Sequence, residues 1–255
     1  MGNKVMPNEV LYHIGISAEM IKGAEYALLP GDPGRVEALA RALGTAEPVG
    51  CHREYTSWLA DVEGTSVLVC STGMGGPSVA IGMEELARLG IKNFIQKDVE
   101  LGDLVINKAA VRLDGTSQHY APLNFPAVAS FELTLALQQA AESLSIPYHT
   151  GISVSSDTFW PGQERYDSYT GYVRKSLQGS LQEWQALGAL NYEMETAALF
   201  IVAQSFGLQA ASICGVVAKR TDSELVAPQD LYELASQRFQ AVVKKTLQDL
   251  IKAGK

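Results

Sequence analysis

Short runs of apolar and β-branched residues alternate along this chain with longer segments in which apolar residues recur every three or four positions. The short runs predict buried strands, and the longer periodic segments predict amphipathic helices. The predicted strands span residues 26–29, 67–71, 92–95, 103–111, 149–155 and 211–217. The predicted helices span residues 33–43, 77–89, 131–144, 192–206 and 231–252. This alternation predicts an α/β fold around a largely buried sheet.

The composition fits a single soluble domain. The 255 residues are 47% hydrophobic and 19% charged, which is typical of a globular chain with a sizeable core. No repeat, low-complexity tract or linker interrupts the chain, so residues 1–255 are expected to form one domain. No apolar run approaches the length of a membrane span, and the N-terminal residues lack the apolar region of a signal peptide.

The net charge and the cysteines indicate which partners and which cellular compartment to expect. The formal net charge is −8, which argues against a nucleic acid or a membrane surface as partner. An anionic substrate would have to be held by local positive charge, because the overall field repels it. The three cysteines (Cys51, Cys70 and Cys214) lack metal-ligand spacing, and the last two lie in apolar runs. Buried free thiols of this kind suit a reducing cytoplasm.

A glycine-rich turn follows the first predicted strand and opens the first predicted helix. It reads Gly31-Asp32-Pro33-Gly34-Arg35. Free N–H groups and the helix dipole favour an anion at such a place, and an arginine adds a two-pronged donor for phosphate oxygens. By pattern alone the same residues also fit an ordinary turn.

The segment SSDTFWPGQERYD at 155–167 carries the most informative side chains. Its Pro-Gly pair forces a turn, and Gln163 and Arg165 follow that turn two residues apart. In an extended loop, residues two apart point the same way. An amide that donates and accepts, beside a guanidinium that only donates, could bind the edge of a flat ring with carbonyls and an N–H. The alternative is a surface loop with a salt bridge.

Two glutamates, Glu193 and Glu195, stand at the predicted start of the helix at 192–206. Carboxylates two apart on a helix do not share a face, so paired acid–base catalysis is not expected. The helix dipole alone would favour acidic residues there. His13 is one of four histidines, and a lone histidine near an N-terminus is usually solvated; the four form no metal-ligand pattern.

Seven short sequence segments, in the same order as in a known family, extend over nearly the whole chain. It resembles the uridine-cleaving branch of the nucleoside phosphorylase I family, whose base-binding segment is similar to residues 155–167. The other blocks are LLPGDPGRVE at 28–37, HREYTSWLA at 52–60, VCSTGMGGPSVAIGMEELARLGI at 69–91, VRLDG at 111–115, FPAVASFE at 125–132 and NYEMETAALF at 191–200. Many blocks in order are a stronger signal than any single motif.

The resemblance implies a three-layer α/β/α sandwich with a mixed central sheet. It also implies a homohexamer, a trimer of dimers in which neighbouring subunits share their active sites. The implied activity is that of a pentosyltransferase in pyrimidine salvage, the reversible phosphorolysis of uridine to uracil and ribose 1-phosphate. Uridine and phosphate would be the substrates, no cofactor would be required, and a potassium ion could lie at the dimer interface.

The same resemblance assigns roles to individual residues. Those implied to be catalytic are Gln163, Arg165 and Glu195. Those implied to bind the base are Phe159, Gln163, Arg165, Tyr192, Glu193 and Arg220. Those implied to bind ribose are His13, Met194 and Glu195, with His13 reaching the 5′-hydroxyl across the dimer interface. Phosphate would be held by Gly31, Arg35 and the neighbouring subunit's copy of Arg53, and the cation by Glu54, Ser78 and the carbonyl of Met74.

The residue type after the last predicted strand favours a pyrimidine over a purine. Purine-cleaving relatives place an aspartate near this point to protonate the purine, whereas this chain has Lys219-Arg220. A cation suits a departing uracil, which carries negative charge on its oxygens. Two residues depart from the family here: Lys219 replaces a usual asparagine, and Val226 replaces a usual proline in the following flap.

One departure affects the implied phosphate site directly. The family runs Phe-Leu-Arg-x-Gly-Thr-Thr-Gly-Ala-x-Gln, with an arginine and a threonine that bind phosphate and ribose, but here Ile95 joins directly to Gln96. Either the sequence is closed up over residues that the protein has, or the deletion is genuine. The intact flanks favour the first, because a strand that loses its end and exit turn must replace its backbone pairing.

Two other kinds of function stay open. One is a purine nucleoside phosphorylase or a hydrolytic nucleosidase of the same fold. The other is a nucleoside-binding protein that has lost catalysis, which a genuine deletion after Ile95 would favour.

Overall fold

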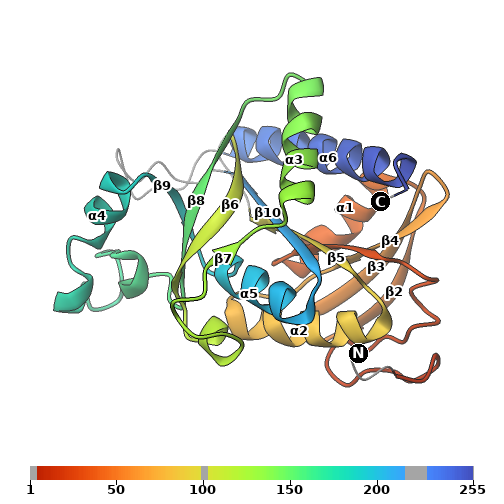
Figure 1. Cartoon of the computed structure of the whole chain (residues 1–255), viewed down its shortest axis with the longest axis horizontal. Coiled ribbons are helices and arrows are strands. Elements are labelled where there is room, and N and C mark those ends of the chain that lie inside the picture. Colours follow the sequence, from red (N-terminus) through yellow and green to blue (C-terminus); the bar gives the residue numbers. More distant parts are fainter. Residues whose placement is uncertain (1–4, 99–102, 216–228, 255) are drawn as a thin grey trace.

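The computed structural model describes residues 5–98, 103–215 and 229–254, and Figure 1 shows their arrangement. Strands of these residues build one sheet, and helices cover both of its faces. The strands are β1 (Tyr26–Pro30), β2 (Ala46–His52), β3 (Tyr55–Val62), β4 (Thr65–Cys70), β5 (Asn93–Asp98), β6 (Leu104–Leu113), β7 (Ala127–Val128), β8 (Tyr148–Ser156), β9 (Ala189–Glu193) and β10 (Gln209–Gly215). The α-helices are α1 (Val36–Leu43), α2 (Gly76–Leu89), α3 (Phe131–Ser143), α4 (Ser180–Ala186), α5 (Thr196–Phe206) and α6 (Gln229–Lys252).

The sheet is mixed. Its order is β2-β3-β4-β1-β5-β10-β6-β8-β9, with β7 paired to β6. The central strands β4, β1, β5 and β10 run parallel, β6 runs antiparallel to β10, and β8 and β9 run parallel to β6. The predicted α/β fold with a mixed central sheet between two helix layers is therefore confirmed.

Two apolar cores lie on opposite faces of the sheet. Phe94 belongs to the core that contains Phe200 of α5, and its neighbour Ile95 belongs to the core that contains Phe239 of α6. This division follows from the geometry of a strand, in which successive side chains point to opposite faces. In Figure 1, α2 and α5 lie on one side of the sheet and α1, α3 and α6 on the other. Among the described residues, no helix is both long and apolar enough to cross a membrane.

The predicted helix at 192–206 begins too early. Its first two residues end β9, where Tyr192 pairs with Val154 and Glu193 pairs with Ser155. The Glu193 carboxylate then accepts the N–H groups of Glu195 and Thr196, so α5 begins at Thr196. The capping carboxylate therefore sets the boundary between strand and helix. Strands β2, β3, β7 and β9 and helix α4 were not predicted.

The strand β5 contains the junction between Ile95 and Gln96. It continues through the junction, where Ile95 pairs with Leu28 of β1 and Gln96 pairs with the next residue, Leu29. On its other side the same two residues pair with consecutive residues of β10, beginning at Ala211. The residues after the junction thus supply backbone pairing for this strand. Whether the sequence is closed up over residues that the protein has stays a prediction, which the intact mass of the protein tests.

Candidate active site

Two side chains of the 155–167 segment, Gln163 and Arg165, are buried although the segment is a loop. Gln163 is 4% exposed and Arg165 is 7% exposed. The guanidinium of Arg165 lies 4.3 Å from the centre of the Phe159 ring, a cation–π contact. The ring of Phe159 packs edge-on against Trp160, with ring centres 5.2 Å apart. The alternative of a surface loop with a salt bridge does not fit this burial.

The loop is not extended, contrary to the expectation from sequence. Pro161–Gln163 form one turn of 3-10 helix, and Glu164 follows in the left-handed region with φ 53°. The N–H of Arg165 donates to the carbonyl of Trp160 at 2.8 Å, which closes the turn. A tight turn, and not strand-like alternation, therefore places Gln163 and Arg165 inside.

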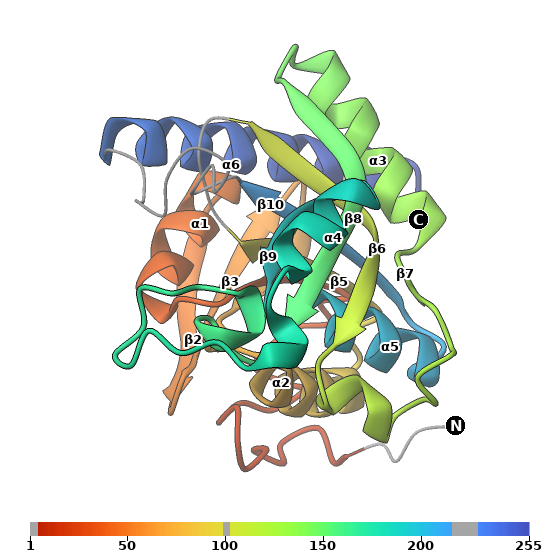
Figure 2. The ribbon, with the colours of Figure 1, turned by 90° about the vertical axis from the view of Figure 1, so that its left-hand side faces the viewer.

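Glu164, between these two residues, fastens the loop to α4. Its carboxylate accepts the N–H groups of Leu181, at 2.7 Å, and Gly179, and the hydroxyls of Tyr166 and Ser180. Burial raises the pKa of Glu164, but the hydrogen bonds from these four donors lower it by more, so the pKa lies below its usual value of 4.5. Figure 2 shows this segment, with α4, against the edge strand β9.

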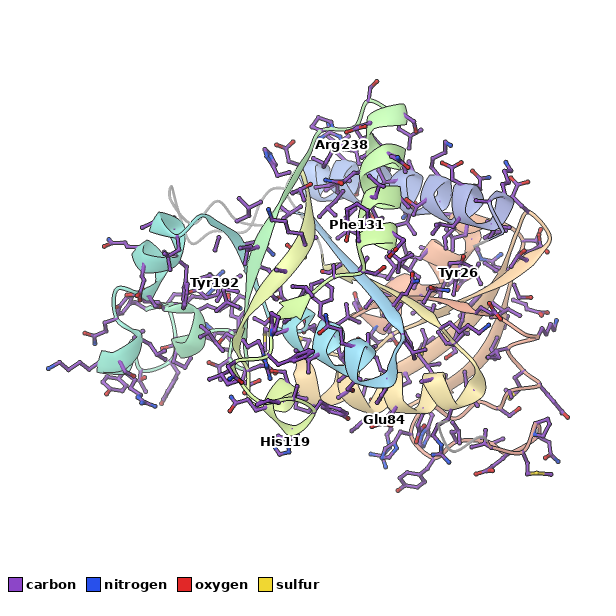
Figure 3. The ribbon with its side chains drawn as sticks, viewed as in Figure 1. Tyr26, Glu84, His119, Phe131, Tyr192 and Arg238 are labelled. Atoms are coloured by element: carbon purple, nitrogen blue, oxygen red, sulfur yellow. The ribbon has the colours of Figure 1, made fainter. Side chains whose placement is uncertain are left out.

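The two glutamates at the start of α5 have different surroundings. Glu193 is buried and accepts the hydroxyls of Ser153, at 3.1 Å, and Ser155 as well as the two helix N–H groups. Glu195 is also buried and accepts the N–H of Gly75 at 2.6 Å. Gly75 is the residue before α2, so Glu195 joins the starts of α5 and α2. Tyr192, labelled in Figure 3, lies where the loop segment meets the sheet.

Within the glycine-rich turn, the Asp32 carboxylate binds some of the turn's own hydrogen-bond donors. The N–H of Gly34 donates to Asp32 at 2.8 Å, and the Arg35 side chain lies 3.4 Å from the same carboxylate. Gly31 is close to the turn that follows β4, since a Cβ on it would lie 3.0 Å from the carbonyl oxygen of Gly73. The N–H of Gly34 is therefore engaged within the turn, and the phosphate roles of Gly31 and Arg35 stay predictions.

The N-terminal residues form an exposed polar surface with the turn between β2 and β3. Arg53 donates to the Tyr12 hydroxyl at 3.2 Å and lies over its ring. Nearby, a hydrogen bond from the Ser78 hydroxyl holds the pKa of Glu54 below its usual value. Met74 is 84% exposed, and its backbone carbonyl, not its soft thioether, would suit a hard cation there. Among the described residues, no group of three or more His, Cys, Asp or Glu could hold a metal ion.

Three residues singled out from the sequence, Lys219, Arg220 and Val226, lie outside the described residues. Met194 follows β9 directly, and its N–H donates to the Glu195 carboxylate at 3.1 Å. The structure thus brings Glu195 to the start of α2, with Met194 beside it in the chain. It places His13 and Arg53 on the exposed N-terminal surface.

Comparison with known proteins gives a consistent result. A family profile described as "Phosphorylase superfamily" matches residues 25–248. The chain belongs to the phosphorylase superfamily. It is 45% identical to the uridine phosphorylase of Escherichia coli over 247 residues, covering 94% of this chain and 98% of that one. It is 47% identical to the uridine phosphorylase of Haemophilus influenzae over 223 residues (84% and 88%), and 36% identical to the guanosine phosphorylase of Halorubrum lacusprofundi over 211 residues (80% and 80%).

The alignments also indicate that these superfamily relatives are longer than this chain within the matched region. Since 94% of 255 residues is about 240, about 7 of the 247 aligned positions in the Escherichia coli match have no residue here. For Haemophilus influenzae, 84% of 255 is about 214, against an alignment of 223. This difference is close in size to the family segment Arg-x-Gly-Thr-Thr-Gly-Ala-x that the sequence lacks after Ile95.

Sequence reasoning missed two acidic residues that organise this region, Glu164 and Glu85. Glu164 drew no attention because it stands between two more distinctive side chains. Glu85 is buried on α2, three residues after the buried Gly82 and four before the buried Leu89. A glutamate on the apolar side of a helix is a signal that could have found it, because carboxylates are almost never buried without partners.

Proposed function

We propose that this protein catalyses the reversible phosphorolysis of uridine to uracil and ribose 1-phosphate. The observation that carries the proposal is the 45% identity, over 94% of this chain, to a uridine phosphorylase. The burial of Gln163 and Arg165 in one turn supports it, because an amide and a guanidinium together complement the uracil edge.

Positioning and preorganised electrostatics would supply the catalysis, without a covalent intermediate. Gln163 and Arg165 would hold the base, with Phe159, Tyr192, Glu193 and Arg220 around it, and would stabilise negative charge as it leaves. Glu195 would accept the 2′- and 3′-hydroxyls of ribose, since a carboxylate has about four acceptor sites and the N–H groups of Gly75 and Met194 use two of them. Met194 would pack beneath the sugar.

Phosphate would attack C1′ from the face opposite the base. Gly31 and Arg35 would hold it, together with Arg53 from a neighbouring subunit. His13 would cross the same interface to the ribose 5′-hydroxyl. These roles require an oligomer, and we propose a hexamer of three dimers in the cytoplasm, with the whole chain as one domain. No cofactor would be needed; Glu54, Ser78 and the Met74 carbonyl offer oxygen ligands that suit a potassium ion at the interface.

A second function deserves a test because of the shortened segment after Ile95. About 7 positions of the Escherichia coli uridine phosphorylase are absent from this chain. If they carry phosphate ligands, the chain would bind nucleosides but use phosphate poorly. Hydrolysis of the nucleoside, or binding without turnover, would be the consequence.

Nucleoside assays with and without phosphate test the proposal. We expect uracil release from uridine only when phosphate is present, and release of base from inosine on the order of 100-fold slower, because a purine cannot make the same polar contacts. Turnover of thymidine, which lacks the 2′-hydroxyl and carries a methyl group on the base, shows whether the site accepts these two changes. Base release without phosphate would indicate a hydrolase, and uridine binding without release would indicate a binding protein; either result would overturn phosphorolysis.

A further inference from the structure

One buried carboxylate fastens the N-terminal segment to α2. Glu85 is 7% exposed, whereas its neighbour Glu84, labelled in Figure 3, is exposed on the outer side of the helix. The Glu85 carboxylate accepts the N–H of His13 at 3.1 Å and the N–H of Ile14 at 2.9 Å. It also meets Nδ1 of the His13 ring at 2.7 Å. Three donors from two successive residues therefore converge on one side chain.

This contact sets the orientation of the His13 ring. An ionised carboxylate only accepts hydrogen bonds, so Nδ1 carries the hydrogen in this pair. The other ring nitrogen, Nε2, has no hydrogen-bond partner among the residues that the structure describes. The side chain is 38% exposed, so Nε2 is available to a group from outside the chain.

The backbone around His13 is held as firmly as its ring. The His13 carbonyl lies 2.8 Å from Nδ1 of His52, and the Tyr12 ring packs edge-on against the imidazole, with centres 4.9 Å apart. Leu11 and Ile14 belong to the same apolar core as the buried side of α2. The His13 ring is thus held in one orientation although it lies at the protein surface.

We propose that Glu85 is a positioning residue, which presents Nε2 of His13 to the ribose 5′-hydroxyl in the neighbouring subunit's active site. The inference rests on the proposed function, which gives His13 that role. Removing the charge of Glu85 weakens three hydrogen bonds at once and frees the imidazole to rotate. If Glu85 only stabilised the fold, its replacement would lower the turnover of every substrate by the same factor.

Kinetics with two substrates separate positioning from a purely structural role. The variants are Glu85→Gln, the matched control Glu84→Gln, His13→Ala, and His13→Ala with Glu85→Gln. We expect Glu85→Gln to lower kcat/KM for uridine roughly 10-fold, the scale of a lost hydrogen bond to a charged group. The kcat/KM for 5′-deoxyuridine, which lacks the 5′-hydroxyl, should be nearly unchanged. Glu84→Gln should affect neither substrate. Glu85→Gln should add little once His13 is alanine.

Equal losses on both substrates, or a full loss from Glu85→Gln in the His13→Ala background, would overturn the inference. Hydrogen exchange followed by mass spectrometry measures the contact without activity. The peptide that contains His13 and Ile14 should exchange faster in Glu85→Gln than in the wild type or Glu84→Gln, and unchanged exchange would refute the contact. A wild type that releases no uracil would overturn the proposed function, and with it the role of Glu85, whatever the exchange result.

Discussion

Replacing Arg165 or Gln163 with alanine is expected to remove about 2–4 kcal/mol of transition-state stabilisation, a roughly 30-fold to 1,000-fold loss in kcat/KM for uridine. Both side chains are buried in the loop after β8, and the Arg165 guanidinium is fixed over Phe159. Donors held in this way need no reorganisation when charge develops on the departing uracil, so their loss falls on the reaction step.

Steady-state kinetics with uridine and phosphate measure this effect. Arg174→Ala is a matched control, because Arg174 is exposed between that loop and α4. Gln182→Ala, at an exposed residue of α4, serves the same purpose for the amide. Thermal unfolding of each variant shows whether the loop is still folded. Near-full activity of either alanine variant at Gln163 or Arg165 would contradict the assigned roles.

Replacing Glu164 with glutamine is expected to destabilise the protein by roughly 2 kcal/mol at pH 7, or about 4–8 °C in Tm. The carboxylate accepts four donors, among them the N–H of Leu181 and the hydroxyl of Tyr166, and an amide cannot accept them all. Since the loop holds Gln163 and Arg165, uridine turnover should fall as well.

The loss of stability at Glu164 should depend on pH with a definite sign. The pKa of the folded-state carboxyl lies below 4.5, so the ionised form stabilises the fold above that value. This stability is lost as the pH falls through the lower, folded-state pKa. The Tm difference between wild type and Glu164→Gln should therefore be full at pH 7 and shrink below pH 4.5. Glu183→Gln, at an exposed residue of α4, is the control; a difference that did not change with pH would contradict this account.

The central strands could be predicted from sequence because they are buried on both faces. Residues of β1 and β4 such as Leu28 and Val69 stand in continuous apolar runs, which is the pattern that parallel strands require. The strand β2 lacks this pattern. It is mostly exposed, contains Pro48 and Gly50, and shifts its register between them, so no alternation marks it.

The site residues could be proposed from sequence, but most of their contacts could not. Glu85 meets His13 from 72 residues away, and Glu195 meets Gly75 from 120 residues away. No local pattern carries such pairings, because the packing of the sheet and helices decides them. The turn at Glu164 could not be predicted for another reason. A non-glycine residue with positive φ is uncommon, and here the buried hydrogen bonds of the Glu164 carboxylate hold the residue in that conformation.

The most direct test of the account is a crystal structure of the protein with uridine bound. We expect the carbonyl and N–H edge of uracil within hydrogen-bond distance of the Gln163 amide and the Arg165 guanidinium, with the ribose hydroxyls on Glu195. A uracil ring bound elsewhere, with Gln163 facing no ligand, would contradict the central claim.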